Sequence, residues 1–262
     1  MTIPDRTIQE AKRQRLFLLL CGIFLTNALI AEIIGGKIFS VETLLGIAPA
    51  QLPIGGQKLD FNMTAGVISW PVVFITSDII NEYFGRKGVK RISYFTSILI
   101  VYTFLIIFTA TKLPPAQFWL DLNNTDTHGN TFNINDAFSK IFNQGLGIMI
   151  GSITAFLLGQ LLDIVVFSWL RRKTGSRFIW LRATGSTMFS QLIDSFVVIG
   201  IAFYVFGNWD LKLVFSVGTI NYLYKAVVAI LLTPLLYVAH YFIDNYLGKE
   251  YAEELSHKAA HE

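Results

Sequence analysis

The chain has 262 residues, of which 53% are hydrophobic and only 15% charged, and its formal net charge is +3 at pH 7. An ordinary soluble domain has about 45–50% apolar and about 25% charged residues, and here the apolar excess lies in runs of twenty or more residues. This composition excludes a soluble enzyme, because no hydrophilic segment is long enough to form a catalytic domain, and it predicts a polytopic membrane protein.

Six apolar runs are each long enough to cross about 30 Å of hydrocarbon as a helix. In chain order the predicted spans are residues 16–36, 62–84, 92–111, 146–169, 183–206 and 213–241. They predict an all-α fold with a single transmembrane domain, residues 16–241, between cytoplasmic tails of residues 1–15 and 242–262. Pro71 predicts a kink in the second span, since proline lacks a backbone donor.

The basic residues predict the orientation, because Lys and Arg are retained on the cytoplasmic side. With the N-terminus inside, the inner segments hold 15 of the 21 Lys and Arg residues, the outer segments hold five, and Lys225 lies within a span. Both termini are therefore predicted to be cytoplasmic. The positive net charge comes from this loop bias, so it does not indicate nucleic-acid binding.

Two outer loops, residues 37–61 and 112–145, separate these spans. The first mixes leucine and isoleucine with glycine and proline, which favours a short interfacial turn or hairpin. The second either caps a cavity or lies on the lipid surface. The single cysteine, Cys21, excludes an intrachain disulfide and a multi-cysteine metal site, and we predict neither a metal site nor a cofactor.

A short polar motif occurs twice within apolar runs: Gln160-Leu-Leu-Asp163 in the fourth span and Gln191-Leu-Ile-Asp194 in the fifth. An intramembrane carboxylate costs several kcal/mol unless it faces protein, water or a ligand. The spacing puts each Gln and Asp on one helical face, and the antiparallel helices place all four about 9–17 Å from the cytoplasmic ends. This arrangement resembles the inverted repeats of transporters, whose substrates bind near the midplane. The alternative is that these side chains form interhelical hydrogen bonds.

The sixth span adds Asn221 and, four residues later, Lys225. Lys225 is expected to be the counter-ion of Asp163 or Asp194, or to handle substrate directly. With the four residues of the repeated motif, Asn221 and Lys225 complete the predicted substrate-binding set.

Near the cytoplasmic end of the second span, Asp78, Asn81 and Glu82 share one helical face. They predict a cytoplasmic gate or the inner wall of a cavity. The alternative is that Asp78 or Glu82 pairs with a basic residue at that end. Asn27 and Glu32 are further polar positions in the first span.

Four segments resemble the queuosine precursor transporters, also called the vitamin uptake transporter family. They are Ser77 to Lys87, Leu158 to Asp163, Ser186 to Phe189 with Asp194, and Asn221-Tyr222 with Lys225. The resemblance covers nearly all six spans in the same order. It implies a multi-pass protein of the bacterial inner membrane, not an enzyme, that imports 7-cyano-7-deazaguanine, 7-aminomethyl-7-deazaguanine or queuine for tRNA modification.

The predicted residue types suit that substrate. A guanine-like edge offers adjacent N–H donors for a carboxylate and a carbonyl acceptor for an amide. Bases also stack on aromatic side chains. The aromatic residues near the polar positions are Phe156, Phe189, Phe196, Tyr222 and Tyr224.

Other functions remain open from the sequence. Six spans without an ATPase domain also suit the substrate-binding subunit of an energy-coupling-factor transporter, which requires separate ATPase partners. Two aspartates on adjacent helices could form an intramembrane aspartyl protease, although that class has Tyr-Asp and Gly-x-Gly-Asp motifs, and a membrane scaffold is a further alternative. The preferred precursor, coupling to protons, sodium or ATP, and homo-oligomerisation are not decided by the sequence.

Overall fold

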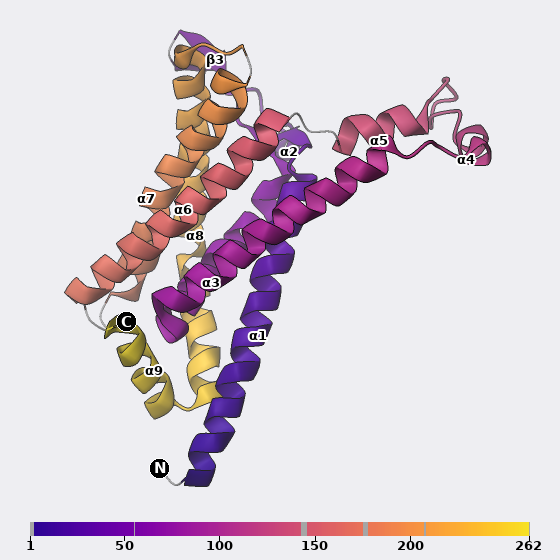
Figure 1. Ribbon diagram of the computed structural model, residues 1–262. Coiled ribbons are helices and arrows are strands. Elements are labelled where there is room, and N and C mark those ends of the chain that lie inside the picture. Colours follow the sequence, from indigo (N-terminus) through magenta and orange to yellow (C-terminus); the bar gives the residue numbers. More distant parts are fainter. Residues whose placement is uncertain (1–2, 55, 143–145, 175–177, 207, 262) are drawn as a thin grey trace.

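The computed structural model describes the whole chain except residues 1–2, 55, 143–145, 175–177, 207 and 262. Long helices form the body of the molecule, and a small group of strands lies at one end of it (Figure 1). Both termini lie toward the opposite end. The last residues of the predicted second outer loop, 143–145, and the predicted cytoplasmic Arg177 lie outside the described residues.

Five helices in the described part of the chain are long and apolar enough to cross a membrane. They belong to α1 (Ile3–Ile34), α3 (Trp70–Lys112), α6 (Leu146–Thr174), α7 (Ile179–Ile199) and α8 (Leu211–Leu247). The shorter helices are α2 (Val41–Leu45), α4 (Gln117–Leu122), α5 (Ile134–Phe142) and α9 (Lys249–His261), with a 3-10 turn η1 (Ala65–Ile68) and a π-helical turn η2 (Gly200–Val205). The prediction of a mostly helical, polytopic membrane protein is confirmed.

Several predicted boundaries are wrong. The second and third predicted spans fall on the single element α3, and residues 62–68 form a strand and a 3-10 turn before it. Pro71 causes no kink because it is the second residue of α3, where a missing N–H has no intrahelical partner to lose. The break lies at Gly85, whose φ of 71° and ψ of −179° are not helical. The predicted tails also contain regular structure, since α1 begins at Ile3 and α9 ends at His261.

The first outer loop contains the predicted hairpin. Strands β2 (Leu52–Ile54) and β3 (Gln57–Leu59) pair antiparallel, and β1 (Ile38–Ser40) pairs with β4 (Asn62–Thr64). Glu42 of α2 stabilises this region, because its carboxylate accepts a 2.7 Å hydrogen bond from the backbone N–H of Phe61. That bond lowers the pKa of Glu42.

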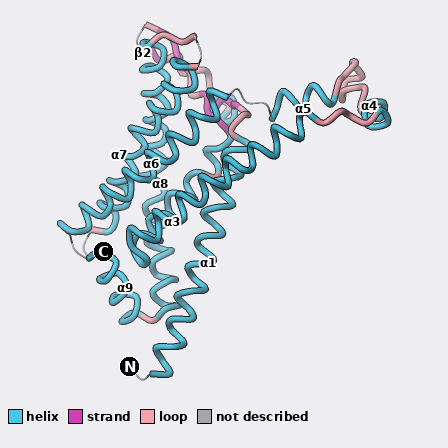
Figure 2. The backbone as a smooth tube through the Cα atoms, in the orientation of Figure 1, coloured by secondary structure: helices cyan, strands magenta, loops and turns pink. Residues whose placement is uncertain are grey.

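The second outer loop forms an arm. Figure 2 shows α4 and α5 extending away from the helical body beyond the end of α3. Within the arm, Asp126 accepts hydrogen bonds of 2.8 Å from the backbone N–H groups of His128 and Asn130. Hydrogen bonds from the side chain and backbone of Asn130 hold the pKa of Asp126 below its usual value.

Glycines bring α6 and α7 together at the centre of the body. A Cβ on Gly151 would lie 3.1 Å from the carbonyl oxygen of Val198, and one on Gly159 would lie 3.5 Å from the Cβ of Asp194. Small residues permit such close packing in membranes. The contacts show that the two helices run antiparallel, so the repeated Gln-x-x-Asp motifs approach one another in opposite directions.

Replacing Gly85 by alanine is expected to destabilise the protein by about 1–3 kcal/mol, because its φ and ψ belong to a region that is essentially limited to glycine. Thermal unfolding of the purified protein in detergent measures this. Gly22→Ala is the control, since Gly22 lies within α1 and an added Cβ would meet nothing within 4 Å. Equal stability of Gly85→Ala and Gly22→Ala would contradict the assigned backbone break.

Candidate functional site

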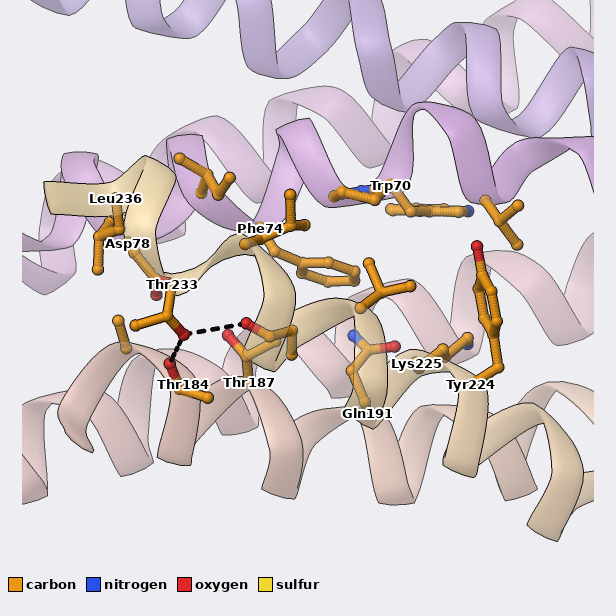
Figure 3. Close-up of a pocket in the computed structure, with 17 residues that line it drawn as sticks. Trp70, Phe74, Asp78, Thr184, Thr187, Gln191, Tyr224, Lys225, Thr233 and Leu236 are labelled. Atoms are coloured by element: carbon orange, nitrogen blue, oxygen red, sulfur yellow. Dashed lines mark hydrogen bonds between the residues drawn. The ribbon is translucent and has the colours of Figure 1, made fainter. Parts of the chain in front are cut away.

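A narrow cleft lies between α3, α7 and α8 in the body of the protein (Figure 3). Its volume is about 60 Å³, so the helices surround it closely in this conformation. Three α3 residues four positions apart, Trp70, Phe74 and Asp78, line one side. Residues at this spacing share a helical face, so one stripe of α3 supplies both aromatic rings and a carboxylate.

Aromatic side chains form the α3 wall. The rings of Trp70 and Phe74 are stacked, with centroids 5.8 Å apart and an interplanar angle of 22°. Phe156 of α6 packs beside them, with its centroid 5.6 Å from that of Trp70. Phe156 was among the aromatic residues expected from the sequence, whereas Trp70 and Phe74 were not, although their spacing of eight and four residues from Asp78 was a usable signal.

Hydroxyl and amide groups of α7 form the facing wall. Thr184, Thr187 and Gln191 line the cleft, and the Thr184 hydroxyl lies 2.6 Å from that of Thr233 on α8. Gln191 is only 2% exposed, and its carbonyl oxygen has no hydrogen-bond partner in the described part of the chain. A buried acceptor without a donor costs about 1–3 kcal/mol, so this amide is suited to a ligand.

Tyr224 and Lys225 complete the cleft from α8. Lys225 forms an ion pair with Asp194 of α7, and the two side chains are only 19% and 17% exposed. Of the two counter-ions left open by the sequence, the structure therefore selects Asp194. Three other aromatic candidates, Phe189, Phe196 and Tyr222, do not line this cleft. Phe196 packs on Phe215, and Phe189 is half-exposed.

Gln160 and Asp163 lie behind the cleft rather than in it. Gln160 accepts a 3.0 Å hydrogen bond from the hydroxyl of Ser77 on α3, and Asp163 lies 3.4 Å from the hydroxyls of Thr187 and Ser190 on α7. The register of α6 against α7 puts the two glutamines at similar depth and the two aspartates about one turn to either side. The repeated motif thus supplies one cleft residue, one ion-pair residue and two buried interhelical residues.

A buried polar cluster lies one helical turn beyond Asp78, toward the end of the cleft that the predicted topology places at the cytoplasm, and it is called the inner cluster. Arg171, at the end of α6, donates hydrogen bonds of 3.0 and 2.8 Å to the backbone carbonyls of Asn81 and Glu82. It also forms an ion pair of 3.4 Å with the Glu82 carboxylate and bonds to Ser256 of α9, whose hydroxyl donates to Glu82 at 2.7 Å. Of the predicted gate residues, Asp78 lines the cleft, while Asn81 and Glu82 belong to this cluster.

At the other end, a cavity of about 1340 Å³ lies between the strands, α5, η2 and α8. It is called the outer cavity, because the predicted topology places this end outside. Asn221 lines it, one helical turn from Lys225 on the same helix. On α1, next to the cavity-lining Ile33, the carboxylate of Glu32 contacts the Ser152 hydroxyl at 2.5 and 2.6 Å. One helical turn thus separates Asn221 of the outer cavity from Lys225 of the cleft, and one turn separates Asp78 of the cleft from Glu82 of the inner cluster.

Much of the same sequence matches a known protein family. Residues 64–239 match the family model described as "Putative vitamin uptake transporter". The chain belongs to the queuosine precursor transporter family. The match covers α3, α6 and α7 and most of α8, which together form the cleft and its surroundings.

Three curated relatives of the family have the same type of name. The chain is 30% identical over 189 residues to a "Probable queuosine precursor transporter" of Bacillus subtilis, which covers 71% of this chain and 76% of the relative. It is 26% identical to a protein of the same name from Haemophilus influenzae, over 88% of each chain, and 27% identical to the "Queuosine precursor transporter" of Escherichia coli, over 69% and 72%. No solved structure matches the chain.

Family membership confirms the predicted resemblance and the prediction that the chain is a transporter rather than an enzyme. The geometry also opposes the aspartyl protease alternative. Asp163 faces the hydroxyls of Thr187 and Ser190, whereas Asp194 pairs with Lys225. These different partners do not suit two carboxylates that share one proton.

Proposed function

We propose that the chain imports 7-deazaguanine precursors of queuosine across the bacterial inner membrane, through the cleft between α3, α7 and α8. The unpartnered carbonyl of Gln191 in this aromatic cleft, within the described part of the chain, is the observation that carries the proposal. The names of the three relatives support the same substrate class.

The cleft combines the groups that a deazaguanine requires. The Asp78 carboxylate and the Gln191 carbonyl accept hydrogen bonds from the N–H donors of its guanine-like edge. Lys225 keeps further N–H donors beside its bond to Asp194, and these suit the carbonyl oxygen of the base. Trp70, Phe74 and Tyr224 can stack on the bicyclic ring, each at about 1–3 kcal/mol.

The proposed topology has six crossings, with both termini in the cytoplasm. As one straight helix, the 43 residues of α3 would be about 65 Å long, twice the thickness of the hydrocarbon. It would also bury Arg86, Lys87, Lys90 and Arg91 near its middle. Two crossings that meet at Gly85 put these basic residues at the cytoplasmic surface, where Arg171 and α9 contact the neighbouring turn of α3.

Gln191→Leu is expected to weaken binding about three- to tenfold, since one uncharged hydrogen bond contributes about 0.5–1.5 kcal/mol. Asp78→Asn is expected to weaken it about ten- to a hundredfold, because bonds to a charged group contribute about 1.5–3 kcal/mol. The measurement is tRNA queuosine in a strain that lacks both precursor synthesis and its own importer, titrated with each precursor.

Gln117→Leu provides a matched control on the exposed arm, where the amide donates a hydrogen bond to Asp121. This variant should restore queuosine as the unaltered chain does, at equal membrane abundance. The site assignment is wrong if Gln191→Leu and Asp78→Asn both respond to precursor as the control does.

A further inference from the structure

Behind the cleft, the carboxylate of Asp163 is surrounded by hydroxyl groups of α7. Asp163 is 2% exposed, and the hydroxyl oxygens of Thr187 and Ser190 each lie 3.4 Å from it. The hydroxyl of Ser186, one helical turn before Ser190, also interacts with this carboxylate. One carboxylate and three hydroxyls therefore form a buried cluster of oxygen atoms between α6 and α7.

Two of these hydroxyls have their protons engaged elsewhere. Ser190 donates to the backbone carbonyl of Thr187 at 3.0 Å, and Ser186 donates to that of Ala183 at 3.1 Å. A serine hydroxyl has a single proton and two lone pairs. The lone pairs of both serines are then left toward the carboxylate, an arrangement that favours a bound cation.

The distances between the hydroxyl oxygens and the Asp163 carboxylate also favour a bound cation. A hydroxyl that donates to a carboxylate lies about 2.5–2.7 Å from it, so 3.4 Å is long for a direct hydrogen bond. Two oxygen ligands at right angles on a hard cation, with metal–oxygen distances of about 2.3–2.6 Å, lie about 3.3–3.7 Å apart. The 3.4 Å separations of Thr187 and Ser190 from Asp163 match two oxygen ligands on one cation.

The charge of a buried Asp163 carboxylate must be neutralised, either by a proton or by a counter-ion. No Lys or Arg among the described residues forms an ion pair with Asp163, and a buried, uncompensated carboxylate is costly. A single carboxylate balances a monovalent ion. Sodium has nearly the ionic radius of calcium, so the distance range above applies to it, and oxygen ligands suit such a hard cation.

We propose that Asp163, Thr187, Ser190 and Ser186 bind a sodium ion that is transported with the substrate. Thr187 joins the two sites, because it contacts Asp163 and also lines the cleft one turn from Gln191. Sodium bound at Asp163 holds the turn of α7 that contains Thr187 in place. This turn is part of the cleft wall that contacts the substrate. The transport part rests on the proposed import function, whereas the binding of sodium does not.

Thermal unfolding of the purified, substrate-free protein tests the ion site directly. At equal ionic strength, sodium chloride should raise the Tm by several degrees over choline chloride, since an ion that binds only the folded state stabilises it, and potassium chloride should do so much less. Asp163→Asn should remove the response to sodium, and Thr187→Val should shift it to higher concentrations. Asp121→Asn, on the exposed arm, should respond as the unaltered protein does.

The Tm of Asp163→Asn in choline chloride shows whether this variant is folded. The substitution removes the uncompensated charge, so the Tm of the variant in choline chloride should equal or exceed that of the unaltered protein. Equal Tm values in sodium and choline chloride for the unaltered protein would overturn the proposal, as would a Tm that depends on pH but not on sodium.

Uptake of a labelled precursor into vesicles distinguishes the ion site from the import function. Faster uptake with an inward sodium gradient than with an equal choline gradient supports both. Uptake that is indifferent to sodium leaves the import function in place and overturns the ion site. A sodium-dependent Tm without uptake supports the ion site and contradicts only the import function.

Discussion

Arg171→Ala is expected to destabilise the protein by about 3–5 kcal/mol, because it removes one partner of a buried ion pair. Arg171 is 3% exposed and bonds to the backbone of α3, to the Glu82 carboxylate and to Ser256 of α9. Its removal leaves Glu82 buried without this cation. Thermal unfolding measures the loss of stability. Limited proteolysis measures the exposure of α9, which should become accessible before the body unfolds.

Arg172→Ala is the matched control, since Arg172 is the next residue and is exposed. It should change stability by less than about 0.5 kcal/mol, as exposed substitutions usually do. Arg171→Lys should not restore stability, because an ammonium cannot reproduce the planar set of donors. Comparable stability of Arg171→Ala and Arg172→Ala would contradict the role assigned to this cluster.

The second large effect is expected at the ion pair of Asp194 and Lys225. Replacing one partner leaves a largely buried charge unpaired, which costs about 3–5 kcal/mol. Asp194→Asn and Lys225→Met should therefore each lower membrane abundance strongly. The double variant should recover abundance, because neutral partners of similar volume remove both charges.

Uptake should separate the structural role of this pair from its role in binding. The double variant should reach the membrane and still import poorly, since Lys225 lines the cleft and its donors to the substrate are gone. Quantitative immunoblotting and precursor uptake measure both properties in the same vesicles. Single variants with full abundance would show that the pair is not needed for stability.

The helical character of the fold could be predicted because apolar runs of about twenty residues have few alternatives in a membrane. The start of α3 could not be predicted. Residues 62–64 pair with β1, a long-range contact that hydropathy does not reveal. The break at Gly85 is different, because the predicted second span ends at residue 84, directly before it, where charged residues interrupt the apolar run.

The polar residues of the site were found for a physical reason, since charges and amides in a membrane need partners. Their partners depend on the packing of helices. Asp163 and Asp194 were equal candidates for Lys225 in the sequence, and the packing of α8 against α7 puts Lys225 beside Asp194. Trp70 and Phe74 were missed because aromatic residues are common throughout the apolar runs.

The polar residues also lie in three separate places. The outer cavity contains Asn221, the cleft contains Gln191 and Lys225, and the inner cluster contains Glu82 and Arg171. The inner cluster is closed, while the outer cavity is large. In the proposed topology this conformation is closed toward the cytoplasm, and import requires the Arg171 cluster to open.

Import through this cleft can be measured as uptake of a labelled 7-deazaguanine by the purified chain alone in ATP-free proteoliposomes. We expect saturable uptake by the unaltered chain and by Gln117→Leu, with an apparent affinity about three- to tenfold weaker in Gln191→Leu. No uptake without added ATPase subunits, or the same affinity in Gln191→Leu as in the unaltered chain, would contradict import by this chain through the Gln191 cleft.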